Sequence, residues 1–256
     1  DLQALDGGWQ ARGTGWTFTL ADGAHWPASD VTLRWPQAGS DTPHALEASY
    51  LDLALARAVA QRLPLPEDAQ AQLARWELQG RAEKLQLRWQ PAMAGHPLRY
   101  RAQGQLQGVS LRDLQADSHT PGLHNANLRF TFDQQGGSAD VEMRQGALEF
   151  PGIFEEPRIP VDRLQASLRW SQDAHGRWSV QVPQAQFANA DAQGQLQLRW
   201  QMGADAARRL PGDLELEGVL SRANGARGHR YLPLEVPPDR RPSVGDRVRC
   251  GRAHNV

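Results

Sequence analysis

The chain is 256 residues long with a formal net charge of −1 and 40% hydrophobic residues, enough for one large domain or two small ones with a core. Its 28 Lys and Arg residues are balanced by 29 Asp and Glu residues, so no positive excess is left to hold a nucleic-acid backbone, and we expect no nucleic-acid partner. A mean hydropathy of −0.60 and the lack of a long uncharged apolar run predict no membrane-spanning helix in these residues.

Taken in chain order, most of the sequence alternates apolar with polar residues, which is the pattern of half-buried β-strands. Turn sequences such as Ala21-Asp22-Gly23 and Gln135-Gly136-Gly137 separate the strands and are typical of antiparallel hairpins. The predicted strands include residues 16–20, 31–35, 85–89, 98–106, 128–132, 164–170, 178–182, 196–200 and 213–220.

One stretch departs from this pattern and predicts a short helical hairpin over residues 53–76. Leu55 and Val59 fall at helical spacing after Asp52, which is a good N-cap residue. Pro64 interrupts this first helix, and a second amphipathic helix follows.

The tripeptide Leu-Arg-Trp closes four of the predicted strands, at residues 33–35, 87–89, 168–170 and 198–200. The intervals are unequal, so the tripeptide is a recurring strand ending and not a fixed-period repeat. We interpret Leu and Trp as facing the interior, with Arg on the wet face beside acidic or Gln neighbours. The alternative is a cationic stripe that meets an anionic partner, and the neighbouring Glu and Asp residues argue against it.

About ten amphipathic strands with only two short helices must bury an apolar face against something else. A second sheet in a sandwich, closure into a barrel, or a curved sheet whose concave apolar face accepts a ligand would each solve this. The nine Trp residues, several of them on strands, make that face large, and an exposed face of this kind normally signals binding.

The sequence holds no Gly-x-Ser-x-Gly elbow, His-Glu-x-x-His zinc helix, phosphate-binding Gly-rich loop or calcium loop. The single cysteine, Cys250, excludes a disulfide framework and a Cys-based zinc site. His119 and His124 share no ligand face, and the adjacent Glu155 and Glu156 are better read as solvated than as an acid/base pair. We therefore expect no catalytic residue, metal site or cofactor, and a protein that is not an enzyme.

Motifs spread over some 180 residues carry a resemblance to the YhdP family, the large AsmA-like bacterial envelope proteins related to TamB. Each motif is weak alone, but their order and spacing make coincidence improbable. They are Leu51-Asp52-Leu53, Arg62-Leu63-Pro64-Leu65-Pro66, Gly80, Leu85 to Trp89, Pro121-Gly122-Leu123, Gly146 to Pro151, Trp178, Phe187 to Asp191, Leu214 to Gly218 and Arg230-Tyr231-Leu232-Pro233.

The resemblance implies a long twisted antiparallel sheet curled into a taco-like groove, in a periplasmic segment of a protein anchored to the inner membrane. It further implies phospholipid transport between inner and outer membrane, with acyl chains as ligands, membrane contacts through parts of the protein outside this chain, and envelope proteins as further partners. The chain starts at Asp1 without Met, a basic region or an apolar region, so we expect it to be part of a longer protein.

The residues that we assign to the lipid-binding groove are the apolar members of the alternating strands. For each of them, packing against neighbours or against the helical hairpin is an equally good interpretation. The set is Leu85, Leu87, Trp89, Leu128, Phe130, Phe132, Leu168, Trp170, Leu196, Leu198 and Trp200.

Two other functions compete with the lipid conduit. One is a structural scaffold for outer-membrane assembly without lipid transport. The other is a closed β-sandwich that binds glycan through surface Trp residues, which is disfavoured because most Trp residues end apolar runs. We expect residues 1–238 to form the β-groove segment. After Pro238 the sequence departs from the family pattern at Arg240-Arg241-Pro242-Ser243, and residues 239–256 are expected to form a poorly ordered tail.

Overall fold

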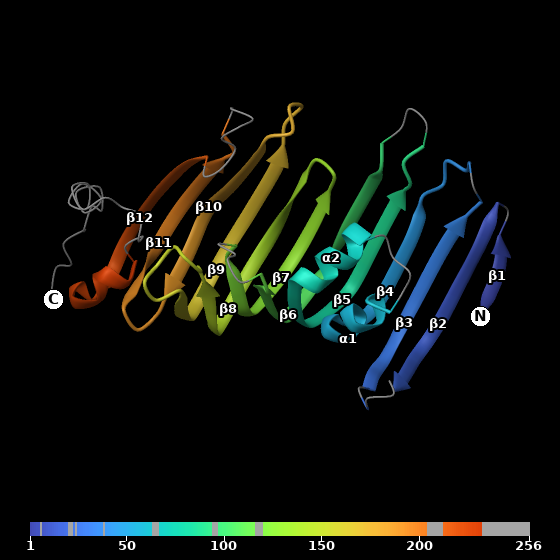
Figure 1. Cartoon of the computed structure of the whole chain (residues 1–256), viewed down its shortest axis with the longest axis horizontal. Helices are drawn as coiled ribbons and strands as arrows, with labels where there is room; N and C mark the ends of the chain where they lie inside the picture. The colour runs from blue at the N-terminus through green and yellow to red at the C-terminus, as the bar shows by residue number, and fades with distance from the viewer. Residues whose placement is uncertain are drawn as a thin grey trace.

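The computed structural model describes residues 1–5, 7–19, 23, 25–37, 39–62, 67–93, 97–115, 120–203 and 212–231. They form one antiparallel sheet of 12 strands that lie side by side in chain order (Figure 1). The strands are β1 (Leu2–Leu5), β2 (Gly8–Thr19), β3 (His25–Pro36), β4 (His44–Asp52), β5 (Trp76–Gln90), β6 (Arg99–Asp113), β7 (Gly122–Asp133), β8 (Gly136–Glu149), β9 (Arg158–Gln172), β10 (Trp178–Ala188), β11 (Ala192–Gln201) and β12 (Asp213–Ala223). Helices α1 (Leu53–Ala60) and α2 (Glu67–Arg75) lie between β4 and β5, and a 3-10 helix, η1 (Gly225–Tyr231), follows β12.

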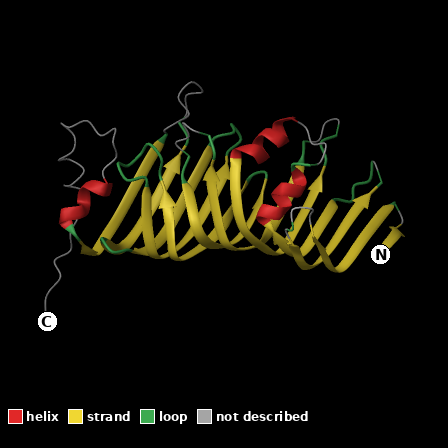
Figure 2. Cartoon of the chain, turned by 60° about the horizontal axis from the view of Figure 1, so that its bottom comes forward, coloured by secondary structure: helices red, strands yellow, loops and turns green. Residues whose placement is uncertain are grey.

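This open, mainly β architecture confirms the fold class predicted from the alternating sequence. Every strand pairs only with its neighbours in the chain, so β1 and β12 are the two ends of the sheet, and Figure 2 shows that the sheet is curved. A closed sandwich is ruled out for the described residues. The expected tail, residues 239–256, lies outside them.

Because strand direction alternates along the chain, the connections fall on two long edges of the sheet. The first edge carries the β3–β4, β5–β6, β7–β8, β9–β10 and β11–β12 connections. The second edge carries the β6–β7, β8–β9 and β10–β11 connections, together with the start of α1 and with η1 (Figure 1).

Cross-strand pairing gathers the apolar side chains on one face, which we call the apolar face. Leu87 of β5 lies opposite Leu46 of β4 and Ala102 of β6. Further along the sheet, Leu198 of β11 lies opposite Leu216 of β12. Since successive side chains of a strand point to opposite faces, the residues between them form a polar face rich in Gln.

Bulges bend the four central strands. Lys84 of β5, Gly108 of β6, Asn125 of β7 and Gln145 of β8 have φ between 51° and 58°, in the left-handed region that is uncommon for residues other than Gly. Register shifts accompany those in β5, β6 and β7. A bulge adds one residue on one strand and increases local bending and twist, so these positions contribute to the curvature of the sheet.

The most deeply buried part of the apolar face lies near the second edge, across β7, β8 and β9. Ala126 and Met143 have no exposed surface, and Val161 is 6% exposed. They are covered by partly buried apolar side chains from the same three strands: Leu123, Leu128, Val141, Leu148 and Leu164. Side chains of a single sheet layer therefore bury one another here.

The predicted helical hairpin covers only a small part of the sheet. The Asp52 carboxylate accepts a hydrogen bond from the Leu55 backbone N–H at 2.9 Å, which confirms the expected N-cap of α1. Both helices lie over one face of the sheet, in front of β4 and β5 (Figures 1 and 2), where Leu55, Ala48 and Ala82 are buried. At the C-terminal end of α2, the Arg75 guanidinium donates to the Asp113 carboxylate at 2.6 and 2.9 Å, which ties the helix to β6.

Replacing Met143 with Ala should lower the free energy of unfolding by about 2–5 kcal/mol, because the change leaves a cavity in the most buried cluster. The matched change Leu214→Ala, on the same face but 61% exposed, should cost less than about 0.5 kcal/mol. Urea unfolding followed by circular dichroism measures both. Equal costs would show that the cluster is not the core of the sheet.

The apolar face and its aromatic rim as the candidate site

All eleven residues assigned to the groove lie on the apolar face. Each is half-buried, whereas polar neighbours such as Arg88, Arg129, Arg169 and Gln197 are exposed. The eleven side chains therefore keep surface that a ligand can contact. Lipid contact at these residues stays a prediction.

An aromatic row runs across the strands near the first edge, and we call it the aromatic rim. Its members are Trp9, Trp35, His44, Trp89, Tyr100, Phe132, Trp170 and Trp200, which lie on β2, β3, β4, β5, β6, β7, β9 and β11. Several neighbouring rings contact one another. The ring centroids are 6.1 Å apart for Trp9 and Trp35, 4.5 Å for Trp35 and His44, and 5.1 Å for His44 and Trp89.

The rim continues past β8 because that strand has Gly at the matching position. Gly137 lies opposite both Phe132 and Trp170. A Cβ atom on Gly137 would approach Phe132 Cβ to 2.5 Å and a Trp170 ring carbon to 2.7 Å. The absence of a side chain therefore lets the two rings meet above β8, with centroids 6.5 Å apart.

The apolar face thus changes in character from edge to edge. Near the first edge it consists of half-buried aromatic rings with Leu side chains beside them, and near the second edge it is the self-packed cluster around Met143. In the described part of the chain, helix α1 packs mainly over β5 and, to a smaller extent, over β4. Among the described residues, no helix covers the apolar face from β8 to β11 (Figure 1), so an apolar molecule can reach its aromatic half.

A polar network at the second edge holds η1 against the sheet. Asn189 and Asp191, in the β10–β11 turn, are each 5% exposed. The Tyr231 hydroxyl donates to Asp191 at 3.1 Å and accepts from the Asn189 amide at 2.9 Å. Arg230 donates to Asp191 at 2.7 Å and also pairs with Glu156. The network joins the β8–β9 loop, the β10–β11 turn and η1.

This network shifts the pKa values of two of its members. Burial raises the pKa of the Tyr231 hydroxyl, the hydrogen bond from Asn189 lowers it in part, and the hydrogen bond to Asp191 raises it again. The hydrogen bond to Glu156 raises the pKa of Arg230. Glu156 is exposed, in agreement with its interpretation as a solvated carboxylate, and it is also an ion-pair partner of Arg230, 74 residues away in the chain.

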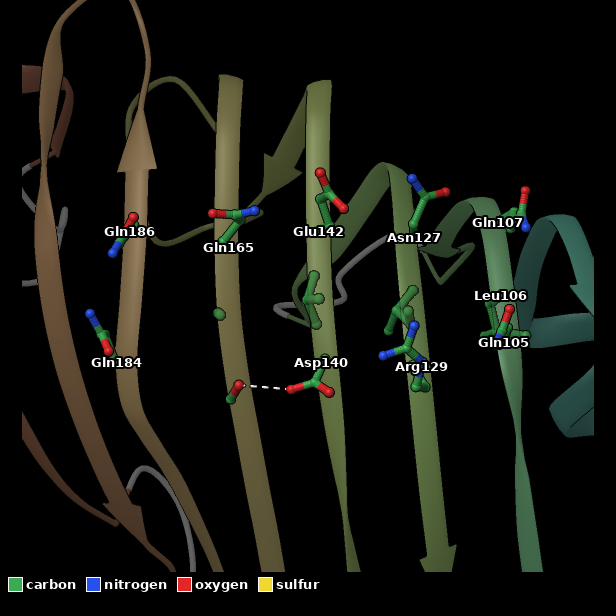
Figure 3. Close-up of a pocket in the computed structure, with 14 residues that line it drawn as sticks. Gln105, Leu106, Gln107, Asn127, Arg129, Asp140, Glu142, Gln165, Gln184 and Gln186 are labelled. Carbon is green, nitrogen blue, oxygen red and sulfur yellow. Dashed lines mark hydrogen bonds between the residues drawn. The ribbon is translucent and has the colours of Figure 1, made fainter.

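Two hollows, each of about 590 Å³, lie on the polar face and not on the apolar face. The first spans β6 to β10 and is lined mostly by amide and charged side chains, which Figure 3 shows on five adjacent strands. Within it the Ser167 hydroxyl donates to Asp140 at 2.7 Å. The second hollow lies near the first edge, on the side of the sheet opposite the Phe132 and Trp170 rings.

The described residues contain no cluster of three or more His, Cys, Asp or Glu side chains placed to hold a metal ion. His124 instead contacts Glu149 at 2.8 Å, and His119 lies outside the described residues. In that same part of the chain, no helix is both long and apolar enough to cross a membrane.

The fold and the site together define a class of protein: an open antiparallel sheet with one long, largely uncovered apolar face. The sequence places it further, because the family model described as YhdP protein matches residues 1–253. The chain therefore belongs to the YhdP family, as its motifs predicted. No curated protein and no solved structure matches it.

Gly137→Ala should separate Phe132 from Trp170 and lower the free energy of unfolding by about 1–3 kcal/mol, because the added methyl overpacks the rim. Gly104→Ala is the matched control on β6, since its Cβ would meet only the tip of the Phe130 ring at 3.3 Å and backbone at 3.4 Å. It should cost clearly less. Urea unfolding measures the cost of both variants, and near-ultraviolet circular dichroism follows the ring contacts. Equal costs would contradict a special role for Gly137.

Asp191→Ala should release η1, because it removes the shared acceptor of Arg230 and Tyr231. Breaking a buried ion pair by removing one partner costs about 3–5 kcal/mol, so hydrogen exchange in residues 225–231 should rise by at least about tenfold. Asp162→Ala is the control, since Asp162 is exposed and, among the described residues, its carboxylate accepts a hydrogen bond from Gln145 alone, at 3.4 Å. Unchanged exchange in Asp191→Ala would show that the network does not hold η1.

Proposed function

We propose that this chain is a periplasmic segment of a phospholipid transport protein that binds acyl chains on the apolar face. The observation that carries the proposal is the long apolar face with an aromatic rim that the described helices leave mostly uncovered. Membership of the YhdP family supports an envelope protein.

Burial of apolar surface supplies the driving force for binding. Each CH₂ group of an acyl chain that leaves water gains about 0.8 kcal/mol. Two rings of the rim, Trp9 and Trp35, are 37% and 44% exposed, and binding would relieve the cost of exposing this apolar surface to water. A lipid chain lying along the face would cover such surface.

The chemistry of the face also suits movement. Along the apolar face, successive strands present Leu, Phe, Ala, Val and Trp, for example at Leu87, Ala102, Phe132 and Trp170. Contacts of this kind are non-directional, so a chain can slide from strand to strand without breaking a strong polar contact. We propose a transport module and not an enzyme, anchored at the inner membrane by a segment outside this chain.

The test introduces charge on one face of β11 at a time. Leu196→Asp with Leu198→Asp places two carboxylates on the apolar face, whereas Gln193→Asp with Gln195→Asp adds the same charge to the polar face of the same strand. The chain is incubated with phosphatidylethanolamine vesicles and re-isolated, and bound lipid is counted by mass spectrometry. The first variant should carry at least about tenfold less lipid than wild type, and the second should match wild type.

Circular dichroism establishes that both variants keep their strand content. Equal loss of lipid from both variants would contradict binding on the apolar face. A wild-type chain that carries no lipid would favour the other candidate, a structural scaffold for outer-membrane assembly. That candidate needs the envelope location but not an accessible apolar face.

A further inference from the structure

An arginine row accompanies the aromatic rim on the other face of the sheet. It consists of Arg34, Arg88, Arg101, Arg169 and Arg199, each next in sequence to a member of the rim. Four of the five come from the Leu-Arg-Trp strand endings, and each lies two or three residues from the end of its strand at the first edge. The first edge therefore has rings on one side and guanidinium groups on the other.

The neighbours of the row do not neutralise it. Arg88 and Arg101 lie directly opposite each other, an arrangement that is unfavourable without a counter-charge. Arg169 lies opposite Ser138 and Gln181. Within the described residues, the side chains of Arg88, Arg101, Arg169 and Arg199 have no hydrogen-bond or ion-pair partner, and all four are exposed. Nearby acids in the sequence argue against a cationic stripe, but cross-strand pairing places few of them opposite the row.

Two acids do face the row, and neither cancels it. Asp133 lies opposite Arg101, but its carboxylate accepts hydrogen bonds from the backbone N–H groups of Gln135 and Gly136 at 2.8 and 3.2 Å, so it serves the β7–β8 turn. Glu215 lies opposite Arg199, near the β12 end of the sheet. The centre of the row holds Arg88, Arg101 and Arg169 against the single carboxylate of Asp133, and it therefore keeps a positive excess.

The second hollow of the polar face lies at this centre. Arg101 and Arg169 flank it from β6 and β9, and the hydroxyl groups of Thr131, Ser138 and Ser171 line it between them. Asp133 also lines it, so the hollow holds two guanidinium groups against one carboxylate. Two guanidinium groups around a set of hydroxyl donors are the groups that bind phosphate oxygens best. Phe132 and Trp170 also line the hollow, so its polar groups and the aromatic rim adjoin.

We propose that Arg101, Arg169 and the hydroxyl groups between them bind the phosphate of a phospholipid headgroup at the first edge. This inference rests on the proposed function, because the acyl chains of the same lipid lie on the apolar face. The glycerol backbone then crosses the edge at the aromatic rim. Trp and Tyr favour such positions, where one side is apolar and the other is wet. The arginine row makes headgroups face the first edge along the sheet.

The test compares the full chain with Arg101→Gln/Arg169→Gln. Its matched control is Arg144→Gln/Arg163→Gln, which removes two exposed arginines that lie opposite each other near the second edge. Each protein is titrated calorimetrically with dihexanoyl phosphatidylglycerol below its micelle concentration, with dihexanoylglycerol, which lacks the phosphate, and with inorganic phosphate. Wild type and control should bind the phospholipid at least about tenfold more tightly than the diacylglycerol. The Arg101/Arg169 variant should lose that preference and bind diacylglycerol as wild type does.

The remaining outcomes overturn the assignment in distinguishable ways. If the Arg101/Arg169 variant binds phospholipid as tightly as wild type, the headgroup site is wrong while binding on the apolar face stands. If inorganic phosphate binds as tightly as phospholipid and depends on the two arginines, the hollow is a site for free anions and not for lipid. If wild type binds neither lipid, the proposed function itself fails.

Discussion

The cross-strand register of a single sheet is the constraint on which the rest of the structure depends. Because each strand pairs only with its neighbours, the position of each apolar residue along its strand decides which residue it meets on the next. A slip of one residue would turn every side chain of a strand to the other face. The aromatic rim, the buried cluster and the arginine row all follow from that register being held from strand to strand.

Apolar side chains are buried to different extents at the two edges of the sheet. Near the second edge, small side chains such as Ala126 beside the fully buried Met143 pack so closely that no second layer is needed. Near the first edge, the rings are too large to bury one another fully, and they remain half-exposed. The buried cluster at the second edge therefore stabilises the sheet, and the aromatic rim at the first edge remains open to a ligand. The polar network around Asp191 also lies at the second edge and stabilises it.

Much of the fold could be predicted from the sequence, because alternation along a strand is a local pattern. The helical hairpin was equally local, since Asp52 caps α1 as its position before Leu55 indicated. The edge-to-edge division was not predictable, because it depends on which residues the register brings together. Gly137 is an example: its role between Phe132 and Trp170 needs both neighbouring strands in place.

The same limit applies to charge. Arg88 and Arg101 are 13 residues apart and look unremarkable in sequence, and only the β5–β6 pairing places them opposite each other. The network at η1 joins Arg230 to Glu156 across 74 residues. A contact over this distance in the chain cannot be predicted from a short motif. The motifs around Asn189 and Arg230 carried the family resemblance, and the structure gives them a shared physical role.

The central claim is that lipid occupies the apolar face, and photo-crosslinking in cells tests it most directly. A photoreactive residue is placed at Phe130 in one variant and at the adjacent Arg129 in another, so that the two probes lie on opposite faces of β7. The account predicts covalently attached phospholipid at position 130 and none at position 129. Protein adducts without lipid at position 130 would contradict it.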